Sequence, residues 1–127
     1  MPSVRLLLSD VMISDETWFY DNDPGPTEAA PPLRPVERVY GLSFNDFSES
    51  DWERLAVIYQ NLPHWLGFGG DECPRWFGAD EGKPPYLWAS VEPAGLQVHG
   101  VLLAKDWEAW DAEFRRAAAI LPKKDVS

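Results

Sequence analysis

The distribution of proline limits where this chain can form regular structure. The stretch 14–38 joins an acidic, aromatic run to five prolines, Pro24, Pro26, Pro31, Pro32 and Pro35. Proline lacks a backbone N–H and restricts the residue before it, so this stretch is predicted to be a long surface loop rather than a helix or an inner strand. A second irregular segment, 63–85, is rich in Gly, Pro and aromatic side chains. Loops this long in a compact domain are usually functional or mobile, so a binding site is expected in them.

The segments outside these loops carry the patterns of regular structure. Short apolar or alternating runs predict four strands, at Val4–Leu8, Arg38–Phe44, Tyr86–Val91 and Leu96–Leu103. The last two flank Glu92-Pro93-Ala94-Gly95, in which Pro and Gly occupy positions that a type I turn prefers. These two strands are therefore expected to form a hairpin.

Two helices are predicted from capping and periodicity. Ser50-Asp51-Trp52-Glu53 fits a capping box, and the apolar residues that follow at helical spacing, up to Pro63, are Trp52, Leu55, Ala56, Tyr59 and Leu62. The second helix is expected from a cap at Asp106 to about Leu121, with an apolar stripe of Trp107, Trp110, Phe114, Ala117 and Leu121. The predicted order is β-β-α-β-β-α. This order favours an α+β domain in which an antiparallel sheet of about four strands has two helices packed on one face.

Length and charge narrow the class of protein. With 127 residues, 45% of them hydrophobic, the chain is expected to form one domain, 1–127, around a single core. It carries 21 acidic and 11 basic residues, a net charge of −10, which argues against nucleic acid or an anionic membrane and favours a basic protein partner. The single Cys73 excludes an intramolecular disulfide and suits a reducing compartment. No apolar run is long enough for a membrane helix or a signal peptide, so a cytoplasmic location is expected.

Residue types that could support catalysis or metal binding occur without the spacing that such chemistry needs. Cys73 could pair with His64 or His99 as nucleophile and base, but nothing local places an imidazole at the thiol. The possible metal ligands lack the paired spacings of zinc sites, and they are His64, Asp71, Glu72, Cys73 and His99. The carboxylate pairs 71–72 and 80–81 are interpreted as solvated, and the glycines of 67–70 as a flexible turn without a phosphate-loop motif. No catalytic residue, metal or cofactor is therefore predicted.

Aromatic residues in the two loops are the most informative feature. Exposed rings flanked by acidic side chains resemble the anchors and rim of a protein interface, whereas rings that fold back would join the core. The predicted partner-binding residues are Asp15, Glu16, Trp18, Tyr20, Asp21, Asp23, Asp71, Glu72, Trp76, Asp80 and Glu81. Trp18→Ala and Trp76→Ala are accordingly expected to weaken binding while the domain stays folded.

The function predicted from these features is that of a non-enzymatic, acidic protein-binding module. In size, acidity and aromatic content the chain resembles the small immunity proteins that bacteria make to neutralise a partner toxin, and no motif carries that resemblance. It implies a bacterial inhibitor that occludes a basic surface of its partner. Two alternatives remain open. The first is a small-ligand-binding domain or minor enzyme with an aromatic pocket near 64–78, and the second is a homodimer that uses the aromatic patch on itself.

Overall fold

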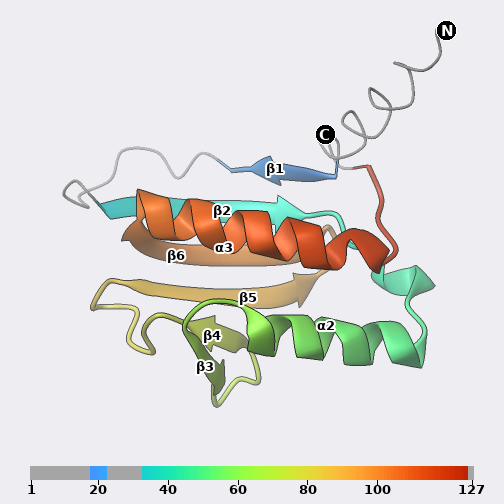
Figure 1. The fold of residues 1–127 in the computed structure, drawn as a ribbon, viewed down its shortest axis with the longest axis horizontal. Coiled ribbons are helices and arrows are strands. Elements are labelled where there is room, and N and C mark those ends of the chain that lie inside the picture. Colours follow the sequence, from blue (N-terminus) through green and yellow to red (C-terminus); the bar gives the residue numbers. More distant parts are fainter. Residues whose placement is uncertain (1–17, 23–32, 126–127) are drawn as a thin grey trace, which may run out of the picture.

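A computed structural model of the protein describes residues 18–22 and 33–125. They form one antiparallel sheet of six strands in the order β1-β2-β6-β5-β4-β3, shown in Figure 1. The strands are β1 (Phe19–Asp21), β2 (Leu33–Tyr40), β3 (Trp65–Phe68), β4 (Pro74–Trp76), β5 (Tyr86–Glu92) and β6 (Gly95–Leu103). The helices are α2 (Glu49–Asn61) and α3 (Ala104–Ala117), with 3₁₀ turns η1 (Phe44–Asp46) and η2 (Ala118–Ile120). The predicted α+β class is confirmed, but the sheet has six strands rather than about four.

The additional strands come from the segments predicted to be loops. β1 lies within 14–38, β3 and β4 lie within 63–85, and the predicted strand Val4–Leu8 falls outside the described residues. β2 also begins at Leu33, five residues before the predicted start, and includes Pro35. Pro35 pairs with Val101 of β6, whereas β1 reaches β2 only at 38–40. The proline is therefore tolerated because no described strand lies on the other side of β2 at that position.

The hairpin and both helices agree with the sequence pattern, with shifts at the helix starts. β5 and β6 pair in register from Tyr86↔Val101 to Glu92↔Gly95. The cap of α2 is Ser48, not Ser50: the Asp51 N–H donates to the Ser48 hydroxyl, and the Ser48 N–H donates to the Asp51 carboxylate at 2.9 Å. Aspartate three positions after Ser48 completes the same reciprocal capping that glutamate would. α3 follows Leu103 without a side-chain cap, and Asp106 lies in its first turn.

The core lies between one face of the sheet and the two helices. Trp76 of β4 is fully buried and contacts both helices. Its indole N–H donates to the Tyr59 carbonyl of α2 at 3.0 Å, and its ring centre lies 5.0 Å from that of Trp110 on α3. Trp107 and Phe114 extend the aromatic packing on α3. Both helices therefore cover the same face of the sheet.

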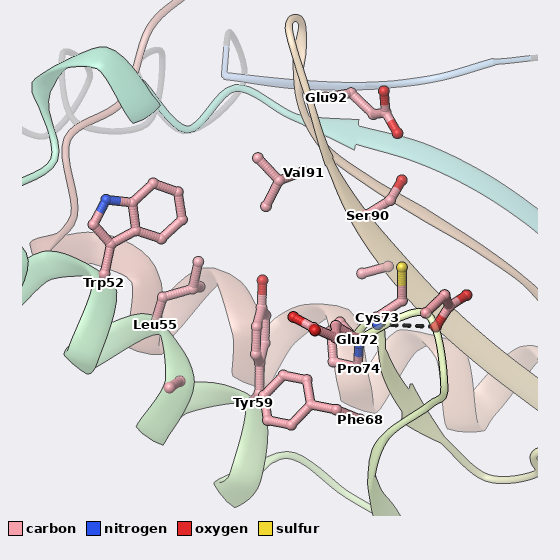
Figure 2. A pocket seen from close by; sticks show the side chains of 13 residues that line it. Trp52, Leu55, Tyr59, Phe68, Glu72, Cys73, Pro74, Ser90, Val91 and Glu92 are labelled. Atoms are coloured by element: carbon pink, nitrogen blue, oxygen red, sulfur yellow. Dashed lines mark hydrogen bonds between the residues drawn. The ribbon is translucent and has the colours of Figure 1, made fainter.

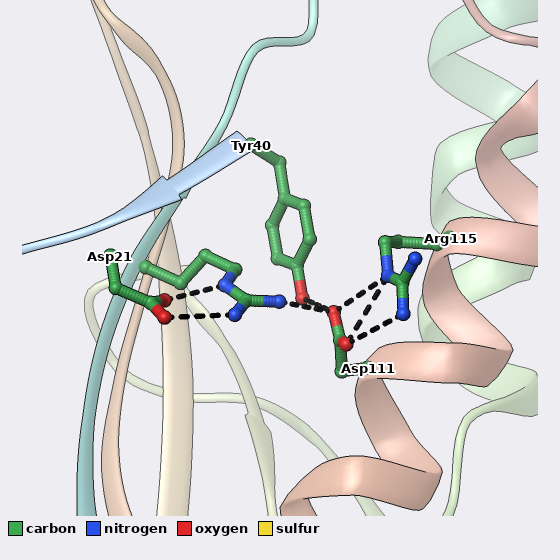
Figure 3. A network of polar contacts seen from close by, with 5 residues as sticks. Asp21, Tyr40, Asp111 and Arg115 are labelled. Atoms are coloured by element: carbon green, nitrogen blue, oxygen red, sulfur yellow. Dashed lines mark hydrogen bonds and ion pairs between the residues drawn. The ribbon is translucent and has the colours of Figure 1, made fainter. Parts of the chain in front are cut away.

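A buried polar network attaches the β1 side of the sheet to α3 (Figure 3). Arg38 of β2 donates to Asp21 of β1 at 2.6 and 2.9 Å and to Asp111 of α3 at 2.6 Å. Asp111 also accepts from the Tyr40 hydroxyl at 2.6 Å and from Arg115 at 3.2 Å. Burial by itself would lower the pKa of Arg38, but the hydrogen bond to Asp21 and the charge of Asp111 outweigh it and raise that pKa. Because every charge has a partner, the network is a structural tie between β1, β2 and α3.

Candidate functional site

An open groove of about 520 Å³ lies between α2, β5 and the loop 69–73, and we call it the α2–β5 groove (Figure 2). It is lined by Trp52, Leu55, Ala56, Tyr59, Phe68, Asp71, Glu72, Cys73, Pro74, Ala89, Ser90, Val91 and Glu92. The groove exists because β4 is short. β4 pairs with β5 only through Arg75↔Trp88 and Trp76↔Leu87, so β5 continues past the point where β4 begins.

The loop 69–73, which closes one end of the groove, is held by its own polar groups. The Asp71 carboxylate accepts from the Cys73 backbone N–H at 3.0 Å and from Arg75 at 2.9 Å. Gly69 donates its N–H to the Cys73 carbonyl at 2.9 Å. The Gly69 backbone lies close against the end of the Arg75 side chain, which would have to shift to make room for a Cβ at this position.

Three apolar side chains of the groove remain largely open to solvent. Trp52 is 41% exposed, Phe68 is 50% exposed and Val91 is 51% exposed. The Trp52 ring is fixed by stacking on Phe44, with ring centres 5.1 Å apart. Exposed apolar groups that are held in place around a hollow are typical of a surface that binds another molecule.

The groove also holds a polar group without a partner. Tyr59 is only 5% exposed, and its hydroxyl points into the groove in Figure 2. The described residues offer this hydroxyl no hydrogen bond, and burial together with nearby Cys73 raises its pKa. Tyr59 therefore stays protonated at neutral pH and can donate to a bound molecule.

The electrostatics of the groove are acidic. Its lining residues include Asp71, Glu72 and Glu92 and no Lys or Arg. Arg75, beside the groove, neutralises Asp71, but Glu72 and Glu92 form no ion pair with the described residues. Burial and the Asp71 charge raise the pKa of the Cys73 thiol, which keeps it protonated at neutral pH. The groove thus favours a ligand that is cationic and partly apolar.

The structure distributes the predicted partner-binding residues over distant places. Asp71 and Glu72 line the groove, and Asp80 and Glu81 are exposed in the loop that follows β4. Asp15, Glu16 and Asp23 lie outside the described residues. Tyr20 and Asp21 belong to β1, at the opposite end of the sheet order from β3 and β4. The predicted set therefore does not form one continuous surface.

Two predicted anchors need correction. Trp18 is 3% exposed, packs beside Tyr40 and Phe114, and is part of the core. Trp76 is fully buried between the helices. Both rings fold inward because large aromatic surfaces gain most by burial, so neither provides an exposed contact. Replacing either with alanine is now expected to destabilise the fold.

Neither histidine lies at the Cys73 thiol within the groove. His64 stacks on Phe77 with ring centres 4.6 Å apart, and His99 stacks on Trp88 at 4.7 Å. Neither residue lines the groove. Within 18–22 and 33–125, no three His, Cys, Asp or Glu residues gather as a metal site would require. Neither imidazole is therefore placed to act as a base for the Cys73 thiol.

The sequence pattern does not indicate the groove role of several residues. Trp52 and Tyr59 share the apolar helical spacing of the first predicted helix, but Trp52 is 41% exposed, and Tyr59 is buried with its hydroxyl pointing into the groove. Val91 and Glu92 were read only as the end of a strand and the start of its turn. One signal was available: Val91 places an apolar side chain beside the acidic turn residue Glu92 at a strand end.

Comparison with known proteins assigns no family. No protein-family model, curated protein or solved structure matches the chain. No helix in the described part of the chain is long and apolar enough to cross a membrane. The function must therefore be argued from the groove itself.

Proposed function

We propose that this chain is a non-enzymatic protein-binding module, of the inhibitor or immunity type, that binds a basic partner protein through the α2–β5 groove. The observation that carries the proposal is the combination of exposed Trp52, Phe68 and Val91 with carboxylates and no cationic side chain in the groove lining. Apolar anchors provide affinity, and the acidic rim attracts and orients a cationic partner.

The size of the apolar contribution favours a protein over a small molecule. Fully burying a large apolar side chain contributes about 1.5–3 kcal/mol, so completing the burial of three half-exposed ones contributes roughly 2–5 kcal/mol. A micromolar complex requires about 8 kcal/mol after the entropy of association has been met. A partner must therefore make contacts beyond the groove. Asp80 and Glu81, exposed on the adjacent loop, are available for this and keep their place in the proposed contact set.

The test is a pull-down from the source cell's lysate at low and high salt, followed by affinity measurement of any captured protein with variants of this chain. Trp52→Ala should lower affinity at least tenfold. Ile120→Ala is the matched control, because Ile120 is 67% exposed and lies outside the groove. Ile120→Ala should change the free energy of unfolding by less than about 1 kcal/mol. Trp52→Ala also loses its stacking on Phe44 and should cost about 1–2 kcal/mol, so affinities are compared under conditions in which urea titration shows both variants to be folded.

Charge reversal tests the acidic rim separately. Glu72→Lys should weaken binding and reduce its salt dependence, whereas Glu108→Lys makes the same change in net charge on the exposed surface of α3 and should do neither. If Trp52→Ala and Glu72→Lys bind as the two controls do, the groove is not the binding surface and the proposal fails.

The unpartnered Tyr59 hydroxyl favours a second candidate, a small cationic organic ligand. Such a ligand would raise the melting temperature of the isolated protein and slow alkylation of Cys73, which lines the same groove. Thermal-shift screening of organic amines separates this candidate from the first. A homodimer through the groove is opposed by its own carboxylates, because two copies would bring Glu72 and Glu92 together. Mass measurement in solution tests that reading.

A further inference from the structure

The groove lies along an open edge of the sheet. β6 pairs with all seven residues of β5, whereas β4 pairs only with Leu87 and Trp88. Residues 89–92 therefore have no strand on the β4 side within the described part of the chain; Ala89 is fully buried, and the edge open to solvent is Ser90, Val91 and Glu92. Unpaired strand edges expose backbone N–H and C=O groups that can pair with another extended chain.

The chain turns away from this edge for local reasons. Pro74, the first residue of β4, has no N–H to donate, and Cys73 before it is engaged by the Asp71 carboxylate. Glu72 has φ of +66°, a turn conformation that no strand adopts. The loop 69–73 consequently leaves the sheet beside Ala89 and closes the groove at one end only.

The two sides of the open edge differ in chemistry. Ala89 and Val91 face α2, and Figure 2 shows Val91 pointing toward Trp52. Ser90 and Glu92 point the other way, toward the sheet face that carries Arg75 and Trp88. Because successive residues of a strand point to opposite faces, a strand added here would place alternate side chains over the apolar groove and beside Glu92.

We propose that the partner contributes an extended segment that pairs with the open edge of β5 at 90–92 and alternates apolar with basic residues. This inference rests on the proposed function and specifies its binding mode. The apolar side chains of the segment cover Trp52 and the groove beside it, and its basic side chains meet the carboxylate of Glu92, which has no ion pair with the described residues. Backbone pairing provides part of the affinity, and the alternation provides the specificity.

The probe is a fluorescent, acetylated and amidated six-residue peptide that alternates lysine with valine. Six extended residues span about 20 Å, enough to cover the three open edge residues in either register. Fluorescence anisotropy should show binding to the full chain. The same peptide with glutamate in place of lysine, and a composition-matched peptide with three lysines followed by three valines, should each bind at least tenfold more weakly.

Two N-methylated isomers of the peptide test strand pairing directly. In one isomer the odd-numbered amides are methylated, and in the other the even-numbered amides. Only one edge of an added strand faces β5, so one isomer should lose at least tenfold in affinity while the other retains it. Amide hydrogen exchange by NMR should also show new protection at alternate residues of 90–92, as pairing requires.

The outcomes separate this inference from the proposed function. If both isomers bind equally and the amides of 90–92 gain no protection, strand addition is overturned while groove binding stands. If no alternating peptide binds but a captured protein depends on Trp52 and Glu72, strand addition is likewise overturned and the protein-binding module stands. If neither peptide nor captured protein depends on the groove, both proposals fall.

Discussion

Removing the Asp111 carboxylate should be among the most damaging single changes to this fold. Asp111 is 8% exposed and accepts from Arg38, Tyr40 and Arg115. In Asp111→Ala, Arg38 keeps only its ion pair with Asp21, and the fully buried Tyr40 hydroxyl loses its hydrogen-bond acceptor. Breaking a buried ion pair by removing one partner destabilises by about 3–5 kcal/mol, a large fraction of the 5–15 kcal/mol typical of a domain.

The same network predicts how much stability two comparison variants should lose. The Asp21 side chain is 46% exposed, so water can replace much of its interaction and Asp21→Ala should cost only about 1 kcal/mol. Replacing both buried partners, in Arg38→Met with Asp111→Leu, removes the charges together. It should be less destabilising than Asp111→Ala alone, because no buried charge is left unpaired, and the remaining cost is the Tyr40 hydroxyl, which loses its acceptor in both variants.

Urea denaturation followed by tryptophan fluorescence measures all three variants at pH 7. The expected order of destabilisation places Asp111→Ala well above Asp21→Ala and above the double replacement. An Asp111→Ala variant that loses less than about 1 kcal/mol, or no more than Asp21→Ala, would refute the reasoning, since it would mean that water reaches Arg38 in the folded state.

Three further predictions concern the cap, the core and the alkaline limit. Ser48→Ala should lower the free energy of unfolding by about 1 kcal/mol in urea titrations, while Ser50→Ala should change it by less than about 0.5 kcal/mol; equal effects would contradict the observed cap. Trp76→Ala, which empties a fully buried site, should cost about 3–5 kcal/mol by the same assay, and a loss below about 1.5 kcal/mol would show that the site collapses. Burial and the charge of Asp111 raise the pKa of Tyr40 well above 10.0, so the stability from its neutral form is complete below pH 10.0 and is lost at higher pH as the unfolded chain ionises. Urea midpoints measured between pH 9 and pH 11 should fall, and should fall less in Tyr40→Phe; an equal fall would exclude Tyr40 as a source.

Local signals predicted the elements whose formation depends on neighbouring residues. The β5–β6 hairpin follows from its turn, and both helices follow from capping and apolar spacing. The strands β1, β3 and β4 are only three or four residues long. They are strands because a partner lies beside them, and single-sequence patterns contain no such information. The α+β class was therefore predictable, whereas the strand number was not.

The candidate site was predictable only in its charge and in part of its location. The sequence pointed to Asp71 and Glu72 in an aromatic loop, and both line the groove. It could not indicate that Trp52 faces outward, because the helical spacing of Trp52 equally suits a core position. Nor could it indicate that β4 begins too late to cover Val91, because that depends on the register between strands distant in sequence.

The pairing of β2 with β6 has a consequence for how the chain is made. Leu33 meets Leu103 and Tyr40 meets Leu96, so the centre of the sheet joins segments that leave the ribosome far apart in time. Until β6 emerges, β2 has no partner on that side, while the β5–β6 hairpin needs only local contacts. We expect the hairpin to form first and β2 to dock afterwards, which arrest-peptide force measurements on nascent chains of increasing length would detect as a late step. A β2 that waits for its partner leaves the interval of synthesis between Tyr40 and Leu103 as the period when this chain most needs protection from aggregation.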